Sequence, residues 1–191
     1  CAGAGEADFA AIEALAAHPK AVAVGEIGLD YYWEENPPRA FQKEVLARQM
    51  ALAEQLGLPV VIHDRDAHGD CMDMARAFPK VRGEFHCYSG SVEDAKVLLD
   101  LGWYLGFGGA LTFKNARKAP DVVAYAPLDR LLLETDSPYL APVPFRGKRN
   151  DSRYLPYVAE RIAAIKGIRA EEAERITWEN ALCFFALEGT W

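Results

Sequence analysis

The alternation of short apolar runs with amphipathic segments is the feature that most constrains the fold of this chain. Five runs, apolar on both faces, are typical of buried strands: residues 21–27, 59–63, 81–86, 103–107 and 130–133. Amphipathic segments that predict helices cover residues 36–57, the stretch from the second run to about residue 77, and residues 91–102, 152–166 and 171–185. Buried strands that alternate with helices predict a parallel sheet covered by helices.

The length of the chain limits how much of a closed barrel it contains. At 191 residues the chain is expected to form a single domain over residues 1–191. One βα unit takes about 30 residues and a closed eight-stranded barrel about 250. The predicted fold class is therefore α/β, with about five βα units, either as an open sheet or as an incomplete TIM-type (β/α) barrel.

Charge and cysteine usage exclude several classes of protein. A formal net charge of −7 argues against a basic coat for non-specific nucleic-acid binding, without excluding a local basic patch. The longest charge-free run, residues 101–113, is rich in glycine and shorter than the ~20 residues that a bilayer requires. The four cysteines form no CxxC pair, and no signal-peptide pattern opens the chain. We therefore expect a cytoplasmic protein without a membrane partner.

Acidic and imidazole side chains stand at the ends of the predicted strands. Glu26 lies near the end of the first strand, His63 and His86 end the second and third, and Asp136 follows the fifth. Ligand sites in parallel α/β folds lie at the carboxyl ends of the strands. Carboxylate and neutral imidazole are ligands of zinc, manganese and similar ions, so we expect these four residues to form a metal site.

Each of these residues also has a structural interpretation. His86 would serve equally as a hydrogen-bonded histidine of the core, and Asp136 as the cap of a turn into Ser137 and Pro138. Glu26 lies within an apolar run and is expected to be buried. A buried, unpaired carboxylate costs several kcal/mol, so Glu26 requires a metal or another cation.

Five motifs resemble those of the TatD family of metal-dependent deoxyribonucleases. In chain order they are GEIGLDYY at residues 25–32, PVVIHDR at 59–65, FHCYSG at 85–90, LETDSP at 133–138 and RGKRN at 146–150. The resemblance covers about residues 20 to 185. It implies an amidohydrolase-like TIM barrel that binds two divalent ions (Mg, Mn or Zn) and hydrolyses phosphodiester bonds in DNA with a metal-activated water.

The resemblance also implies a role for each candidate residue. Glu26 would be shared by both ions, and His63 and His86 would complete one of the two ion sites. Asp136 would face the other ion and act as the general base on the attacking water. Glu26 and Asp136 are therefore the expected catalytic residues.

Three features are candidates for binding a DNA substrate. They are Arg65, Tyr31 with the aromatic residues after it, and the basic loop of Lys148, Arg149 and Asn150. A guanidinium fork suits phosphate oxygens, although Arg65 would equally form an ion pair with Asp64 or Asp66. The aromatic segment would stack on unpaired bases or pack against the barrel rim. The basic loop would bind a polyanion or simply be solvated.

One departure from the family pattern stands out. The family's barrel opens with a strand ending in His-x-His, which binds the second ion, and no His-x-His occurs here. We therefore expect the first three strands to be absent, which leaves unpaired sheet edges that favour self-association. The chain would then be part of a longer enzyme, a natural short form without activity, or a barrel completed by another chain.

Three functional hypotheses follow. The first is a divalent-metal-dependent deoxyribonuclease acting on DNA ends or single strands. The second is a metal-dependent hydrolase of a small ester, amide or lactone. The third is an inactive truncated barrel that binds one metal or a partner.

Overall fold

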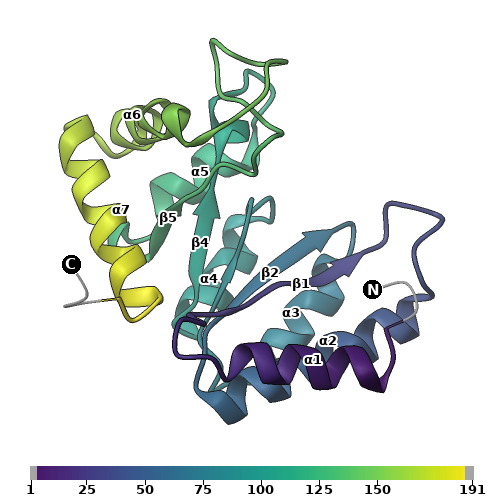
Figure 1. Cartoon of the computed structure of the whole chain (residues 1–191). Coiled ribbons are helices and arrows are strands. Elements are labelled where there is room, and N and C mark those ends of the chain that lie inside the picture. The colour runs from purple at the N-terminus through teal and green to yellow at the C-terminus, as the bar shows by residue number, and fades with distance from the viewer. Residues whose placement is uncertain (1–3, 188–191) are drawn as a thin grey trace. The chain divides into compact units, whose positions relative to one another are not determined.

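The structure, a computed structural model, describes residues 4–187 (Figure 1). These residues divide into two compact units, which meet in the sequence between Phe85 and His86. The expectation of a single domain over residues 1–191 stays a prediction. Each unit is described below by itself.

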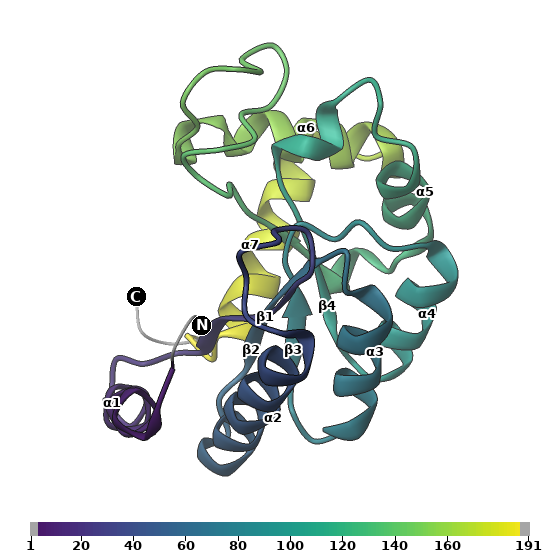
Figure 2. The ribbon, with the colours of Figure 1, turned by 90° about the vertical axis from the view of Figure 1, so that its right-hand side faces the viewer.

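The first unit alternates helices with parallel strands. Its elements are α1 (Glu6–Ala16), β1 (Val24–Asp30), α2 (Arg39–Leu56), β2 (Val60–Arg65), α3 (His68–Ala77) and β3 (Gly83–Phe85). β2 pairs in parallel with both β1 and β3, and Ile62 is the register partner of Ile27 on one side and of Phe85 on the other. α2 packs on β1 and α3 on β2, as Figures 1 and 2 show. The carboxyl ends of the three strands therefore point the same way.

Helix α2 forms the largest part of the apolar layer over β1. Its core-facing residues include Val45, Leu46 and Met50, all at most 3 % exposed. Gly57 ends the helix with φ +67°, a left-handed conformation that glycine adopts without a Cβ clash. The predicted helix over residues 36–57 is thereby confirmed, and its first turn begins after Pro38.

The second unit contains two parallel strands and four α-helices among its described residues. Its elements are α4 (Val92–Asp100), β4 (Tyr104–Phe107), α5 (Lys118–Tyr125), β5 (Leu131–Leu133), α6 (Leu155–Lys166) and α7 (Ala170–Phe184), with short 3-10 turns η1 (Gly109–Thr112), η2 (Leu128–Arg130) and η3 (Ser152–Tyr154). Ser91 is the N-cap of α4, and its hydroxyl accepts a hydrogen bond from the Asp94 amide at 3.1 Å in a capping box.

Helix α7 fixes the position of β5. It packs against α6 and β5, and its Phe184 is fully buried (Figure 1). The buried Asn180 side chain donates hydrogen bonds to the carbonyl oxygens of Leu128 and Leu131, at 2.9 and 2.8 Å. α7 thus holds the strand whose carboxyl end leads into the candidate site.

The predicted strands and the five predicted helices are present, with shifts at their ends. The first strand spans Val24–Asp30 instead of residues 21–27, because Gly28 continues the strand instead of ending it. Two helices were not predicted. They are α1, in which no residue is buried, and α5, which contains Pro120 in its first turn, where proline is tolerated.

Two further features are the state of the cysteines and the length and polarity of the helices. Cys71, Cys87 and Cys183 are free thiols, whereas Cys1 lies outside the described residues. Across residues 4–187, every helix is too short or too polar to cross a membrane.

Candidate metal centre

A β-bulge in β1 sets the position of Glu26. The register between β1 and β2 shifts between Val24 and Ile27, which places Gly25 and Glu26 in the bulge. A bulge re-aims side chains, and Glu26 is exposed even though it lies within an apolar run. The expectation of a buried Glu26 is therefore wrong: the bulge turns its carboxylate out of the core.

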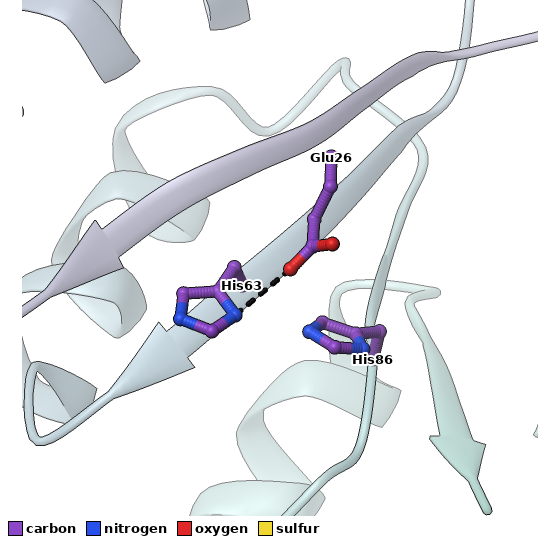
Figure 3. A group of neighbouring side chains, drawn as sticks. All are labelled: Glu26, His63 and His86. Atoms are coloured by element: carbon purple, nitrogen blue, oxygen red, sulfur yellow. Dashed lines mark ion pairs between the residues drawn. The ribbon is translucent and has the colours of Figure 1, made fainter. Parts of the chain in front are cut away.

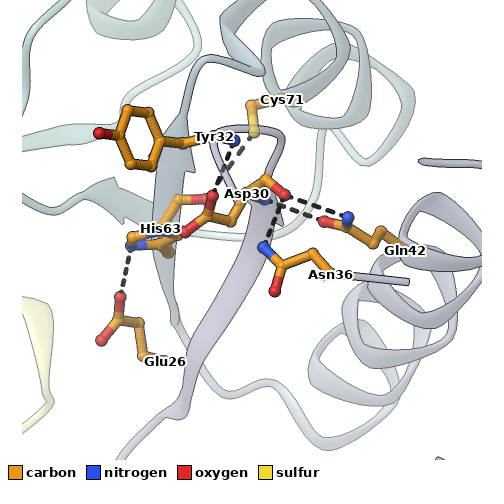
Figure 4. A network of polar contacts seen from close by, with 7 residues as sticks. All are labelled: Glu26, Asp30, Tyr32, Asn36, Gln42, His63 and Cys71. Carbon is orange, nitrogen blue, oxygen red and sulfur yellow. Dashed lines mark hydrogen bonds and ion pairs between the residues drawn. The ribbon is translucent and has the colours of Figure 1, made fainter. Parts of the chain in front are cut away.

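His63 lies between two carboxylates. Its Nδ1 is 2.8 Å from Oε1 of Glu26, and its Nε2 is 3.2 Å from Oδ2 of Asp30 (Figures 3 and 4). All three residues come from the paired strands β1 and β2, where Gly28 is the register partner of His63. A Cβ on Gly28 would lie 1.9 Å from the His63 carbonyl oxygen, so only glycine allows the two strands to approach this closely.

A network of hydrogen bonds orients Asp30. The buried Gln42 accepts a hydrogen bond from the Asp30 amide at 2.9 Å and donates one to the Asp30 carbonyl at 3.1 Å (Figure 4). Asn36 donates to the same carbonyl at 3.0 Å, and the Tyr32 amide donates to Asp30 Oδ1 at 3.0 Å. Asp30 was not selected from the sequence as a site residue, although its place shortly after the predicted first strand and within the GEIGLDYY motif was the available signal.

His86 directly follows β3. Because Ile62 and Phe85 are register partners, His63 and His86 are each the next residue after one member of that pair. Of the two histidines labelled in Figure 3, His63 therefore lies within β2, and His86 is the first residue after β3.

Within the second unit, His86 belongs to a group with Cys87 and Glu134. One ligand atom of each of these residues lies within 4.8 Å of the others. His86 Nδ1 is 3.6 Å from Glu134 Oε2, and the Cys87 amide donates a hydrogen bond to Glu134 Oε1 at 2.6 Å. Burial raises the pKa of the Cys87 thiol to about 12, so Cys87 remains a thiol, a weak ligand, near neutral pH. Glu134 was missed as a site residue, although it lies in the LETDSP motif two residues before Asp136.

Asp136 lies in the loop after β5, outside the group of His86, Cys87 and Glu134. Its backbone adopts φ +54°, a left-handed conformation that Asp tolerates better than most residues, and its carbonyl accepts a hydrogen bond from the Tyr139 amide at 2.8 Å. Asn150 supports this loop, because its side-chain amide donates to the Thr135 carbonyl at 2.6 Å. Asn150 is only 2 % exposed, so its side chain faces the protein interior.

An aromatic and cationic patch lies beside the end of β2 in the first unit. The Arg65 guanidinium is 4.3 Å from the ring centroid of Tyr32 and 5.8 Å from that of Trp33, and both rings are about half exposed. Arg65 forms no ion pair with Asp64 or Asp66; Asp64 instead contacts His68. Tyr31 donates a hydrogen bond from its hydroxyl to Asp70 at 2.6 Å.

The predicted basic loop lies on the surface of the second unit. Lys148 and Arg149 are exposed and have no ion-pair partner within residues 4–187. Arg153 is neutralised instead by Asp151, to which its Nη2 donates at 2.7 Å. The free positive charge of this loop is therefore that of Arg146, Lys148 and Arg149.

The sequence matches a protein family over almost its whole length. Residues 2–186 match the family described as "TatD related DNase". The chain belongs to this family. The family assignment made from the five motifs is confirmed, and so is the assignment to an enzyme class, the hydrolases.

Named relatives and a solved structure give the same result. The chain is 48 % identical over 184 residues to "Uncharacterized metal-dependent hydrolase YabD" of Bacillus subtilis, a match that covers 95 % of this chain and 72 % of the relative. It is 33 % identical over 185 residues to "3'-5' ssDNA/RNA exonuclease TatD" of Klebsiella pneumoniae, covering 93 % of this chain and 70 % of that protein.

The crystal structure of YjjV, a TatD homologue from Escherichia coli, superposes with a TM-score of 0.88 at 30 % identity, over 96 % of this chain and 71 % of that one. The predicted TIM-type parallel β/α fold is confirmed.

The donor set of the first unit fits a divalent cation. Glu26, Asp30 and His63 supply carboxylate oxygens and imidazole nitrogens, which suit zinc and manganese. Their side chains remain partly exposed, so an ion can reach them from solvent. A bound ion would replace the present contacts of His63 with the two carboxylates.

Proposed function

We propose that this chain, a metal-dependent hydrolase of the TatD family, cleaves phosphodiester bonds in DNA, at ends or in single strands. The observation that carries the proposal is the placement of His63 of β2 between two carboxylates of β1, that of Glu26 in the bulge and that of Asp30 at the carboxyl end of the strand. Glu26 was expected near the end of the first strand and lies instead near the start of β1. The nuclease named among the relatives, from Klebsiella pneumoniae, supports nucleic acid as the substrate class.

Glu26, His63, His86 and Asp136 are the proposed metal ligands, for about two divalent ions of Mg, Mn or Zn. When bound, such ions stabilise the negative charge that develops on phosphate oxygens. In the first unit, Glu26 and His63 would hold the ion and orient each other. Asp136, in the loop after β5, accepts the proton of the attacking water as the general base. Glu134, fixed by the Cys87 amide, is an additional candidate ligand beside His86.

The proposed DNA contacts combine stacking surfaces with cations. Tyr32, Trp33 and Arg65 present exposed rings and a guanidinium, which is the combination that binds unpaired bases and phosphates. Tyr31 extends this surface. Lys148 and Arg149 contribute free positive charge, whereas Asn150 is a positioning residue that holds the loop of Asp136. Cytoplasmic location and self-association stay predictions.

A nuclease assay tests the proposal. The full 191-residue chain is incubated with single-stranded and double-stranded DNA in Mg²⁺ or Mn²⁺, with and without EDTA, and compared with Glu26→Gln and Asp136→Asn. Glu35→Gln is the matched control, because Glu35 is an exposed carboxylate in the loop after β1. We expect the wild type to cleave DNA and EDTA to abolish this cleavage. The cleavage rate should fall by about a hundredfold or more in both site variants and stay at the wild-type value in the control.

Three outcomes would count against the proposal. Cleavage that persists in both site variants would reject the assignment of Glu26 and Asp136. Hydrolysis of a small ester such as p-nitrophenyl acetate, without cleavage of any nucleic acid, would favour the small-molecule hydrolase instead. Absence of both activities in the presence of metal would favour the inactive barrel.

A further inference from the structure

The second unit contains a cavity of about 350 Å³ beside the group of His86, Cys87 and Glu134. Cys87 itself lines the cavity, together with residues of η1 and of the segment that leads into α5. This volume lies within the range of small-ligand pockets. None of the roles given above uses the cavity.

The inner wall of the cavity is apolar and aromatic. Phe107 and Leu111 are each 2 % exposed and form its rigid part, and Phe113 stands at its edge, only partly buried. Phe107 is the register partner of Leu133 in the pair of β4 and β5. Leu133 comes one residue before Glu134 in the sequence. An aromatic wall of this kind binds a flat, apolar-faced group.

The rim of the cavity is polar and positively charged. Arg117 and Lys118 are exposed, and neither takes part in an ion pair among the residues that the structure describes. Asn115 adds a side-chain amide that donates and accepts hydrogen bonds. A cavity with an aromatic wall, an amide and two free cations suits a planar heterocycle that carries a phosphate.

Phe113 also lines a second cavity. This second cavity, also about 350 Å³, is bounded by Arg146 and Lys148 of the basic loop. The Arg146 guanidinium lies 4.3 Å from the Phe113 ring centroid and fixes that ring. A strand with one base in the first cavity would meet positive charge directly beyond Phe113.

From these contacts we infer that the cavity lined by Phe107, Leu111 and Phe113 binds one nucleobase of the substrate, with the attached phosphate held by Arg117 and Lys118. The inference rests on the proposed function for its substrate class. It goes further in assigning a base subsite to residues that lie outside all five sequence motifs. Phe113 supplies the stacking ring of this subsite.

Binding of two small probes tests the inference without any cleavage step. The dissociation constants of deoxyadenosine monophosphate and of 2-deoxyribose 5-phosphate are measured by calorimetry on the full chain. Both probes carry the same phosphate, so their ratio isolates the contribution of the base. We expect the base to tighten binding about tenfold or more in the wild type.

Two variants of the cavity separate binding from folding. Phe113→Ala removes the stacking wall, and Ala116→Leu fills the cavity while Phe113 stays in place. Both should bring the ratio close to one. Tyr125→Ala is the matched control, because Tyr125 is an exposed aromatic residue at the end of α5 that does not line the cavity, and it should keep the wild-type ratio.

The result that overturns the inference is a wild-type ratio near one, or a ratio that both cavity variants leave unchanged. This failure is distinct from failure of the proposed function. A chain that cleaves DNA but binds both probes equally would keep the nuclease proposal and lose the base subsite. A chain that binds the nucleotide selectively but cleaves nothing would lose the nuclease proposal and keep the subsite.

Discussion

The candidate ligands of the two units differ in how they are held. In the first unit the side chains of Glu26 and His63 are 50 % and 31 % exposed, and they contact each other directly at 2.8 Å. In the second unit Glu134 and His86 are 18 % and 12 % exposed and lie 3.6 Å apart. Glu134 is fixed by a backbone amide, whereas Glu26 is held by a side chain in an open bulge.

This difference indicates that similar ligand side chains contribute differently to the stability of the two units. A half-exposed carboxylate can be removed at little cost in stability, since water replaces its partners. An enclosed carboxylate that satisfies a backbone N–H cannot, because its removal leaves that donor without an acceptor. Replacement of a candidate ligand should therefore reduce activity without loss of stability in the first unit, and should reduce both activity and stability in the second.

The largest expected effect is on hydrolysis and involves both units. His63→Gln and His86→Gln should each reduce DNA cleavage by about a hundredfold or more, because each removes a proposed metal ligand. His18→Gln is the control, since His18 is exposed and lies before β1. Initial rates with Mn²⁺ measure the effect. If either variant cleaved at the wild-type rate, that histidine would not be a metal ligand in the reaction.

The next effect is on stability and compares the two carboxylates. Glu134→Ala should lower the free energy of unfolding by about 1–3 kcal/mol, because the Cys87 amide loses its acceptor. Glu26→Ala should change it by less than about 0.5 kcal/mol. Urea unfolding followed by circular dichroism measures both, and Glu134→Gln, which keeps an acceptor oxygen, should recover most of the loss. Equal losses for the two alanine variants would contradict the comparison.

A smaller effect concerns Tyr31 and is dependent on pH. The hydrogen bond from the Tyr31 hydroxyl lowers the pKa of Asp70 below its ordinary value of 3.8, and burial raises the pKa of Tyr31. A lowered carboxylate pKa stabilises the folded state above pH 3.8, and this stabilisation is lost as the pH falls through the native pKa. Tyr31→Phe should therefore cost about 1 kcal/mol at pH 7 and progressively less in acid.

Unfolding at pH 7 and near pH 3 measures this dependence. Tyr32→Phe is the control, because Tyr32 is half exposed. A loss in Tyr31→Phe that is the same at both pH values would show that its contribution comes from packing and not from the charge of Asp70.

The sequence predicted the strand–helix alternation and the placement of His86 directly after a strand, because apolar runs are local patterns. His63 was expected to end the second strand, whereas β2 continues to Arg65. It did not predict the exposure of Glu26, since a bulge depends on pairing with β2 and leaves no local signal. Glu134 was missed because its amide partner is 47 residues away in the sequence. The contact of Arg65 with an aromatic ring was also not predicted, because the partners expected for Arg65 were charged groups, a phosphate or an aspartate.

Metal binding tests the central claim most directly. The chain is stripped with EDTA, titrated with Mn²⁺, and the bound ion is counted by electron paramagnetic resonance for the wild type, Glu26→Gln and the control Glu35→Gln. We expect about two bound ions per chain in the wild type and in the control, with affinity reduced about tenfold or more in Glu26→Gln. A wild type that binds no Mn²⁺, or a Glu26→Gln variant that binds it as the wild type does, would contradict the account.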